Sequence, residues 1–198
     1  METIRGRTSF AVDVNKFKEQ LASYDRVLLD LGTGDGRYVR TLAHKHPNWF
    51  IIGVDACREN LREHSQAKLQ NMLFIIASAQ NLPKELNGQI PHITINFPWG
   101  SLLESLLKND PLLMRGLDSI SHSAASLDLH LNAGALAEAG TQLEVGVEQI
   151  YNNLLQAGWR VKTPIMMNPE ALKTFPSTWA KRLAIGRNPR AVKLTAQR

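Results

Sequence analysis

The chain contains Asp30-Leu31-Gly32-Thr33-Gly34-Asp35-Gly36-Arg37 directly after a short apolar run, Val27-Leu28-Leu29. This order predicts a buried strand, a glycine-rich turn and a helix. Glycine has no Cβ and tolerates positive φ, so alternate glycines let the chain turn sharply and bring bare backbone against a ligand. A second apolar run, residues 50–55, ends in Asp55, a carboxylate that could accept both hydroxyls of a ribose. Together they predict a site for a nucleoside-containing cofactor.

The glycine spacing narrows the choice of cofactor. A dinucleotide fingerprint needs G-x-G-x-x-G, but here Gly36 comes one residue early and Arg37 stands where the third glycine belongs. This disfavours a nicotinamide enzyme. The stretch instead resembles motif I of the S-adenosylmethionine-dependent methyltransferases, an acid followed by x-G-x-G-x-G. That resemblance implies that Asp30 faces the methionine end of S-adenosylmethionine.

Length and composition bound the remaining possibilities. The 198 residues suffice for one domain with a sizeable core, and the apolar fraction of 43% is that of a soluble globular protein. No apolar run approaches the roughly eighteen residues of a membrane span, and no basic-then-apolar signal opens the sequence. Cys57 is the only cysteine, and the six histidines lack zinc-site spacing. We therefore expect one cytoplasmic, monomeric domain over residues 1–198 without a metal.

Apolar strand patterns and helix patterns alternate along most of the chain. An N-terminal β-hairpin within residues 1–14 and a helix over 17–22 should precede the main fold. We expect strands at 26–30, 50–55, 72–77, 92–97 and 125–131, and helices at 37–44, 58–69 and 102–107. Because parallel strands need crossover helices, this alternation predicts an α/β fold whose parallel sheet is covered on both faces.

The last third of the chain is less regular. Residues 132–146 are rich in Ala and Gly and should form a partly helical connector, followed by a helix to about 156 and a strand that begins at 158. A helix over 176–185 and a closing strand over 191–195 complete the expected elements. Two late strands joined by a long excursion resemble the antiparallel end of a methyltransferase sheet. The expected fold is thus Rossmann-like, class I, with a mostly parallel seven-stranded sheet and the N-terminal hairpin.

The basic charge is concentrated at one end. The formal net charge is +5, yet the segment 171–198 contains seven basic residues and no acid, and the rest of the chain has sixteen basic and eighteen acidic residues. Such a segment is either a solvated surface or an electrostatic footprint that neutralises phosphates. The candidate phosphate ligands are Lys181, Arg182, Arg187 and Arg190 in this segment, with Arg5 and Arg7 in the hairpin.

A second motif follows the fourth core strand. Asn96-Phe97-Pro98-Trp99-Gly100 should lie beside the donor methyl group, because ligands of open α/β sheets bind outside the carboxyl ends of the strands. The motif resembles the Asn-Pro-Pro-aromatic loop of amino-methylating nucleic-acid enzymes, with Phe97 in place of the first proline. The alternative for Trp99 is core packing under the next helix. Trp179 lies among the basic residues, a mixture typical of base stacking combined with phosphate binding.

The two late motifs, Phe97 to Gly100 and Trp179-Ala-Lys-Arg-Leu-Ala-x-Gly-Arg187, combine with the glycine loop in a specific likeness. Over nearly the whole chain, the sequence resembles the kanamycin–apramycin resistance methyltransferases, which modify ring nitrogen 1 of an adenine in helix 44 of small-subunit 16S rRNA, at the decoding aminoacyl site. The resemblance implies a donor site and two base-gripping tryptophans, Trp99 and Trp179. The implied donor-site residues are Asp30, Gly32, Gly34, Asp55, Ala79, Gln80, Asn96, Phe97, Pro98, Gly100, Ser101, Ser177 and Thr178. Gln80 replaces an acidic residue of the family, and the connector 132–146 is shorter than the family's linker.

Such a reaction asks little of the side chains. A sulfonium methyl group is already activated, and an unprotonated ring nitrogen needs no general base, so positioning should dominate catalysis. The base must be rotated out of its helix, at a cost of a few kcal/mol that two indole faces can offset. Three alternatives remain: a methyltransferase acting on a tRNA guanine or an exocyclic amine, a nicotinamide enzyme, or a ribosome-binding module with a vestigial pocket.

Overall fold

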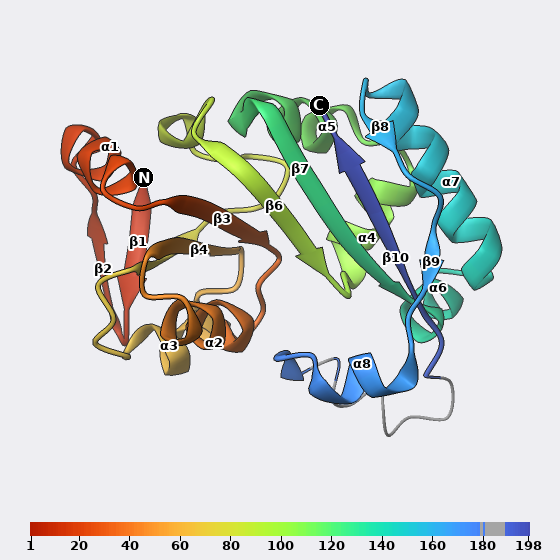
Figure 1. Cartoon of the computed structure of the whole chain (residues 1–198), viewed down its shortest axis with the longest axis horizontal. Coiled ribbons are helices and arrows are strands. Elements are labelled where there is room, and N and C mark those ends of the chain that lie inside the picture. Colours follow the sequence, from red (N-terminus) through yellow and green to blue (C-terminus); the bar gives the residue numbers. More distant parts are fainter. Residues whose placement is uncertain (179, 181–188) are drawn as a thin grey trace.

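The computed structural model describes residues 1–178, 180 and 189–198 (Figure 1). Ten strands in these residues form one sheet, in the order β2-β1-β5-β4-β3-β6-β7-β10-β8, with β9 also paired to β10. The strands are β1 (Glu2–Arg5), β2 (Thr8–Ala11), β3 (Arg26–Leu31), β4 (Trp49–Asp55), β5 (Met72–Ile76), β6 (Ile90–Asn96), β7 (Ser121–Asn132), β8 (Arg160–Val161), β9 (Ile165–Met166) and β10 (Ala191–Gln197). The expected α/β architecture is confirmed.

The central five strands, β5-β4-β3-β6-β7, are parallel, as the alternating pattern predicted. One face of the sheet packs against α2 (Arg37–Lys45) and α3 (Arg58–Ser65), whose buried residues join Leu28, Ile51 and Phe74 in a cluster. The larger cluster lies on the other face, where α1 (Val14–Ala22), α4 (Gly100–Leu107), α5 (Pro111–Ile120) and α7 (Leu143–Gln156) pack. Successive side chains of each strand point to opposite faces of the sheet, so these apolar strands make both faces apolar and helices cover both.

The sheet ends differ from its centre. β10 runs antiparallel to β7 and pairs with two short strands, β8 and β9. These two short strands together take the place of the seventh strand of the expected sheet. At the opposite edge, the hairpin β1–β2 adds two strands, with Thr3 opposite Ile75 of β5. The expected antiparallel end and N-terminal hairpin are both present.

Several boundaries differ from the sequence expectation. The helix expected over 58–69 ends at Ser65, whose hydroxyl accepts a hydrogen bond from the Gly6 amide at 2.8 Å and so meets the hairpin turn. The helix α5 was missed, although Asp110 caps it and Pro111 occupies its first turn, a combination typical of helix starts. α7 begins at Leu143, inside the expected connector, and the short helix α6 (Ala133–Glu138) fills most of the remainder.

The C-terminal segment forms a short helix that was also missed, α8 (Pro169–Thr174), which Asn168 caps. In Figure 1, α8 lies below the lower ends of β6 and β7, on the same side of the molecule as α2. Most of the helix expected over 176–185 falls outside the described residues. Among the helices that are described, none has both the length and the apolar character needed to cross a membrane.

Candidate functional site

The glycine loop connects β3 to α2 in the way the sequence predicted. The amides of Gly32 and Thr33 donate to the carbonyl oxygen of Val54 at 2.8 and 3.0 Å, which fastens the loop to the end of β4. Gly32, Gly34 and Gly36 all have positive φ, between 59° and 77°. A Cβ on Gly36 would lie 2.4 Å from Cε1 of Phe74. The third glycine therefore lets the loop pack closely on the sheet, which is a structural role.

A cavity of about 330 Å³ opens beside this loop, at the carboxyl ends of β3, β4 and β6. Most of its lining comes from the glycine loop, the end of β4, the turn after β5 and the loop after β6, and the C-terminal segment contributes Ser177. Of the predicted donor-site residues, the cavity is lined by Asp30, Gly32, Gly34, Asp55, Ala79, Gln80, Asn96, Phe97, Pro98, Ser101 and Ser177. Gly100 and Thr178 are not part of the lining. The topology thus brings together residues that lie as far apart as 30 and 177 in the sequence.

Asp30 is the most buried carboxyl group at the cavity, with 1% of its surface exposed. Its Oδ1 accepts hydrogen bonds from the Thr94 hydroxyl at 2.9 Å and from the Asn96 amide nitrogen at 2.7 Å. Burial raises the pKa of Asp30 to about 6, although these hydrogen bonds lower it and the nearby Asp55 carboxylate raises it slightly. A cation placed in the cavity would stabilise the ionised form of Asp30.

Asp55 holds the backbone around the cavity with both of its oxygens. Its Oδ2 accepts from the Gly34 amide at 2.8 Å, and its Oδ1 accepts from the Cys57 amide at 2.9 Å. A carboxylate offers about four acceptor positions, so these two bonds leave capacity for two hydroxyl groups. The sequence analysis predicted the glycine loop and Asp55 independently, and in the structure a hydrogen bond joins them directly.

The turn after β5 brings Ala79 and Gln80 to the cavity. The Gln80 amide nitrogen donates to the Ser105 hydroxyl at 2.8 Å, and Ser105 donates to Asp110 at 3.2 Å. This chain of hydrogen bonds fixes the Gln80 amide with its nitrogen toward α4. An amide fixed in this way retains its carbonyl oxygen as an acceptor for an N–H group.

The loop after β6 contains two aromatic residues with opposite environments. Phe97 is 3% exposed and belongs to a small cluster with Leu172, Ala180 and Ala191, although its φ of 53° is unusual for a non-glycine residue. Trp99 is 38% exposed, and its indole N–H donates to Glu138 at 3.2 Å. Trp99 is therefore a rim residue of the cavity, and the alternative of core packing is wrong for it.

The C-terminal segment closes one side of the cavity. The Thr178 hydroxyl donates to Asp35 of the glycine loop at 2.5 Å, and the Phe175 ring stacks on Tyr38 of α2 with centroids 5.4 Å apart. Ser177 is buried and lines the cavity directly. Four predicted residues of this segment, Trp179, Lys181, Arg182 and Arg187, lie outside the described residues.

Comparison with known proteins identifies the family. The family model described as "NpmA: 16S rRNA (adenine(1408)-N(1))-methyltransferase" matches residues 2–198. The chain belongs to this family. A 16S rRNA (adenine(1408)-N(1))-methyltransferase of Escherichia coli is 32% identical over 205 residues, covering 94% of each chain.

Solved structures agree with this NpmA family assignment. The 16S rRNA methyltransferase KamB has a TM-score of 0.89 at 27% identity, covering 100% of this chain and 99% of its own. A variant of the Catenulisporales acidiphilia 16S rRNA (adenine(1408)-N(1))-methyltransferase, determined with S-adenosylmethionine, has the same fold, with a TM-score of 0.88 at 24% identity and coverage of 100% and 96%. The protein is an RNA methyltransferase whose methyl donor is S-adenosylmethionine.

Three of the predicted RNA contacts in this NpmA-family chain, Arg5, Arg7 and Arg190, fall within the described residues. Arg5 and Arg7 are exposed on the hairpin. Arg190 forms an ion pair with Glu144 at 2.8 Å, which an RNA phosphate would have to displace or join.

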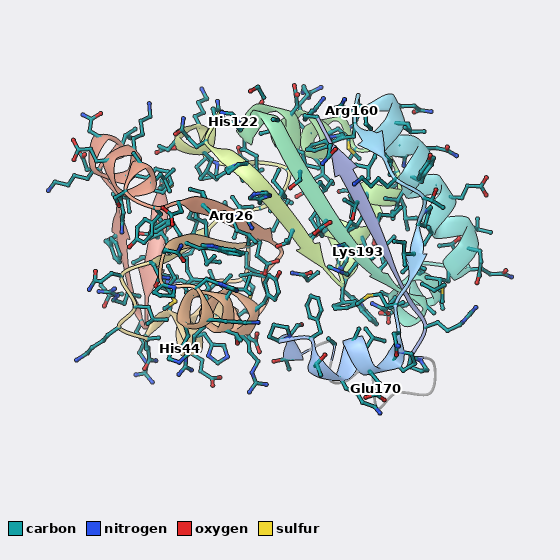
Figure 2. The ribbon with its side chains drawn as sticks, in the orientation of Figure 1. Arg26, His44, His122, Arg160, Glu170 and Lys193 are labelled. Carbon is teal, nitrogen blue, oxygen red and sulfur yellow. The ribbon has the colours of Figure 1, made fainter. Side chains whose placement is uncertain are left out.

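The structure also reveals a basic groove that the sequence analysis missed. It measures about 550 Å³, runs between α2 and α3, and is lined by Arg37, Arg40, Thr41, His44, His64, Ala67, Lys68 and Leu69. Figure 2 labels His44 on α2, on the same side of the molecule as Glu170 of α8. Acidic residues elsewhere in the first 170 positions offset these cations in any count of net charge. Only the helical pairing of Arg37 with Thr41, and of Arg40 with His44, on one face could have indicated the groove.

Proposed function

We propose that the protein transfers a methyl group from S-adenosylmethionine to ring nitrogen 1 of adenine 1408 in 16S rRNA, at the decoding site in helix 44 of the small ribosomal subunit. The modification would confer resistance to aminoglycosides such as kanamycin and apramycin. The observation that carries the proposal is the half-exposed indole of Trp99 at the rim of a cavity lined by three carboxylates, those of Asp30, Asp35 and Asp55, in a chain of the NpmA family. The site of action is the cytoplasm, and the protein acts as a monomer.

The donor occupies the 330 Å³ cavity in this proposal. Asp30 faces its methionine end, Asp55 accepts its ribose hydroxyls, and the carbonyl oxygen of Gln80 accepts its adenine amine. Gly32, Gly34 and Ala79 leave room for the donor against the backbone, and the residues of the loop from Asn96 to Ser101, with Ser177 and Thr178, complete the enclosure. Support comes from the hydrogen bonds within the chain that hold Asp30, Asp55 and Gln80 in place.

Bound S-adenosylmethionine supplies a methyl group on a sulfonium, which needs no further activation. Ring nitrogen 1 of adenine has an in-plane lone pair at neutral pH, so no side chain has to remove a proton. The residues around the cavity therefore act by alignment, bringing the nitrogen within about 3 Å of the methyl carbon and excluding water. Asp30, the buried carboxylate at the methionine end of the donor, also favours binding of the cationic donor over binding of the neutral product that the donor becomes.

Base capture falls to two tryptophans. Trp99 stacks on one face of the flipped adenine, and Trp179 stacks on the other. The exposed indole at the cavity rim supports the first of these roles, and the basic sequence around Trp179 supports the second. Each stacked face contributes about 1–3 kcal/mol, which offsets the cost of rotating the base out of its helix.

Phosphate binding is divided between the C-terminal segment and the basic groove. A variant with Lys181, Arg182, Arg187 and Arg190 changed to alanine should bind small subunits more weakly and with a flatter dependence on salt. An Arg40→Ala, Lys68→Ala variant of the groove should do the same. Each lost contact should lower the slope of log K against log[salt] by about 0.7–0.9, because fewer counterions are released. Filter binding at several salt concentrations measures this slope.

Lys18→Ala is the matched control for that experiment, since Lys18 is an exposed lysine on α1, away from the cavity. Its salt slope should equal that of the wild type, and donor affinity should be unchanged in all three variants. Identical slopes for the wild type and the C-terminal variant would contradict phosphate binding by this segment and would leave it as a solvated surface.

Methyl transfer itself tests the proposed function. Small subunits are incubated with the protein and radiolabelled S-adenosylmethionine, and primer extension then locates the methylated base, because methylation of ring nitrogen 1 blocks pairing. We expect a single strong stop at adenine 1408. Label on another nucleotide or on tRNA would show that the enzyme has a different substrate from the one proposed. Binding of small subunits without any label would indicate a non-catalytic module. Analysis of the digested nucleosides distinguishes ring nitrogen 1 from the exocyclic amine.

A further inference from the structure

His130 is a buried histidine beside the cavity that plays no part in the chemistry above. It lies on β7, opposite Lys193 of β10, and its side chain is only 6% exposed. The Phe97 and Phe175 rings lie 5.8 and 5.0 Å from its imidazole, centroid to centroid, and the Phe175 contact is edge-on. Packing thus holds the imidazole ring in one place and shields it from water.

The imidazole meets the cavity through Asn96. Its Nδ1 lies 2.8 Å from Oδ1 of Asn96, and the Nδ2 of the same amide lies 2.7 Å from the Asp30 carboxylate. An amide nitrogen only donates and a carboxylate only accepts, so Nδ2 has to point at Asp30. The amide oxygen then faces His130, whose Nδ1 must bear a proton. One hydrogen bond therefore selects both the tautomer of His130 and the orientation of Asn96.

The backbone of His130 holds the same loop. Its carbonyl oxygen accepts a hydrogen bond from the Phe97 amide at 2.8 Å. Phe97 has a φ of 53°, a left-handed conformation that persists in a non-glycine residue only where the surroundings enforce it. His130 is thus hydrogen-bonded to two successive residues, Asn96 and Phe97, at the start of the loop that leads to Trp99.

We propose that His130 is a positioning residue for methyl transfer: its Nδ1–H holds Asn96 so that the amide binds Asp30 and the loop from residue 96 to 101 keeps its place. The inference rests on the proposed function and deepens it. His130 touches neither the donor nor the target base. Its effect on the reaction passes through Asn96 to the carboxylate at the methionine end of the donor.

The charges around His130 favour the neutral imidazole that this arrangement requires. Burial and, to a smaller extent, the Lys193 ammonium on β10 lower the pKa of His130 to about 4, against an opposing effect of the Asp128 carboxylate. At the other end, Asp30 faces Asp55 of β4 and the partly buried Tyr38 of α2. The hydrogen bond from Asn96 is one of the interactions that lower the pKa of Asp30. Releasing Asn96 should therefore raise that pKa.

Two substitutions separate the hydrogen bond from the packing. His130→Phe keeps an aromatic ring against Phe97 and Phe175 but removes the donor, whereas His130→Asn restores an N–H at the δ position and gives up the ring. In His130→Phe, we expect the methylation rate at saturating small subunits to fall about tenfold, the scale of one lost hydrogen bond, with KM for small subunits unchanged. Calorimetry should show weaker S-adenosylmethionine binding than in the wild type. As the pH is lowered, this binding should be lost with a midpoint at a higher pH than in the wild type. His130→Asn should recover the rate to within about threefold and return the midpoint.

The control is His92→Phe. His92 lies on β6 and bonds only to Ser126 among the described residues, at 2.6 Å, so its loss should leave all of these measurements unchanged. Wild-type rates and an unshifted midpoint in His130→Phe would overturn the inference, as would equal losses in the Phe and Asn variants with equally lowered melting temperatures. If the wild type itself fails to methylate small subunits, the proposed function fails, and the calorimetric comparison still tests the positioning role.

Discussion

Replacing Trp99 with alanine should reduce the rate of methyl transfer to small subunits by about ten- to a hundredfold, the equivalent of 1–3 kcal/mol of lost stacking. The indole stands at the cavity rim with 38% of its surface exposed, so its removal costs the fold little. Donor affinity and small-subunit binding should stay near wild type, because carboxylates and phosphate contacts supply them. Trp99→Phe should recover part of the rate, since a smaller aromatic ring still stacks.

Trp179→Ala should give the same loss if that residue forms the other side of the clamp. The matched control is Trp159→Ala. Trp159 is 2% exposed, and the Arg198 guanidinium lies 4.6 Å from the centroid of its ring. Removing such a core residue typically costs about 3–5 kcal/mol of stability, so this variant should melt early. The clamp is wrong if the Trp99 and Trp179 variants melt as early as Trp159→Ala, or methylate at wild-type rates.

Asp30→Asn should weaken S-adenosylmethionine binding by about ten- to a hundredfold, matching the 1.5–3 kcal/mol of a hydrogen bond to a charged group. Thr94 and Asn96 both donate to the same carboxylate oxygen, so an asparagine can accept both bonds and the fold should persist. Asp55→Ala should weaken binding by a similar factor. Unchanged calorimetric affinity in both variants would contradict the placement of the donor.

The pH dependence of Asp30 gives this prediction a second signature. Its pKa rises from an ordinary 3.8 to about 6 in the folded chain, so between about pH 4 and 6 the folded state binds the extra proton. This contribution to stability is complete below pH 4 and is lost as the pH rises through 6. Without donor, Asp30→Asn should therefore melt later than wild type at pH 7.5, and the difference should shrink toward pH 4. Wild-type donor affinity should fall on acidification through pH 6, while that of the variant should stay level.

Local patterns were enough to predict the glycine loop, the two acids and the parallel sheet. The loop is defined by residues next to one another, and Asp30 and Asp55 each end an apolar run, so neither depends on distant contacts. Gly36, which was not among the predicted donor-site residues, packs against Phe74 and does not line the cavity. That role depends on which side chain of β5 lies beneath the loop.

Residues that act through strand register could not be predicted in this way. His130 appears in the sequence as one polar position in an alternating strand, and only the pairing of β6 with β7 sets it beside Asn96. The basic groove likewise needs α2 and α3 to pack together before Arg40 and Lys68 share a surface. Thr178 does not line the cavity itself, but its hydroxyl bonds to Asp35, which does, and the 143 positions that separate them in the sequence hide this contact from local patterns.

The N-terminal hairpin has a consequence for the behaviour of the chain in concentrated solution. Without it, β5 would form the rim of the sheet, and its sequence Met72-Leu73-Phe74-Ile75-Ile76 contains no charge, proline or glycine. Unpaired backbone along such an apolar strand is a template for adding strands from other molecules. The hairpin replaces that rim with β2, which is four residues long and begins with Thr8 and Ser9. On this basis, the hairpin lowers the tendency of that edge of the sheet to add strands from other molecules.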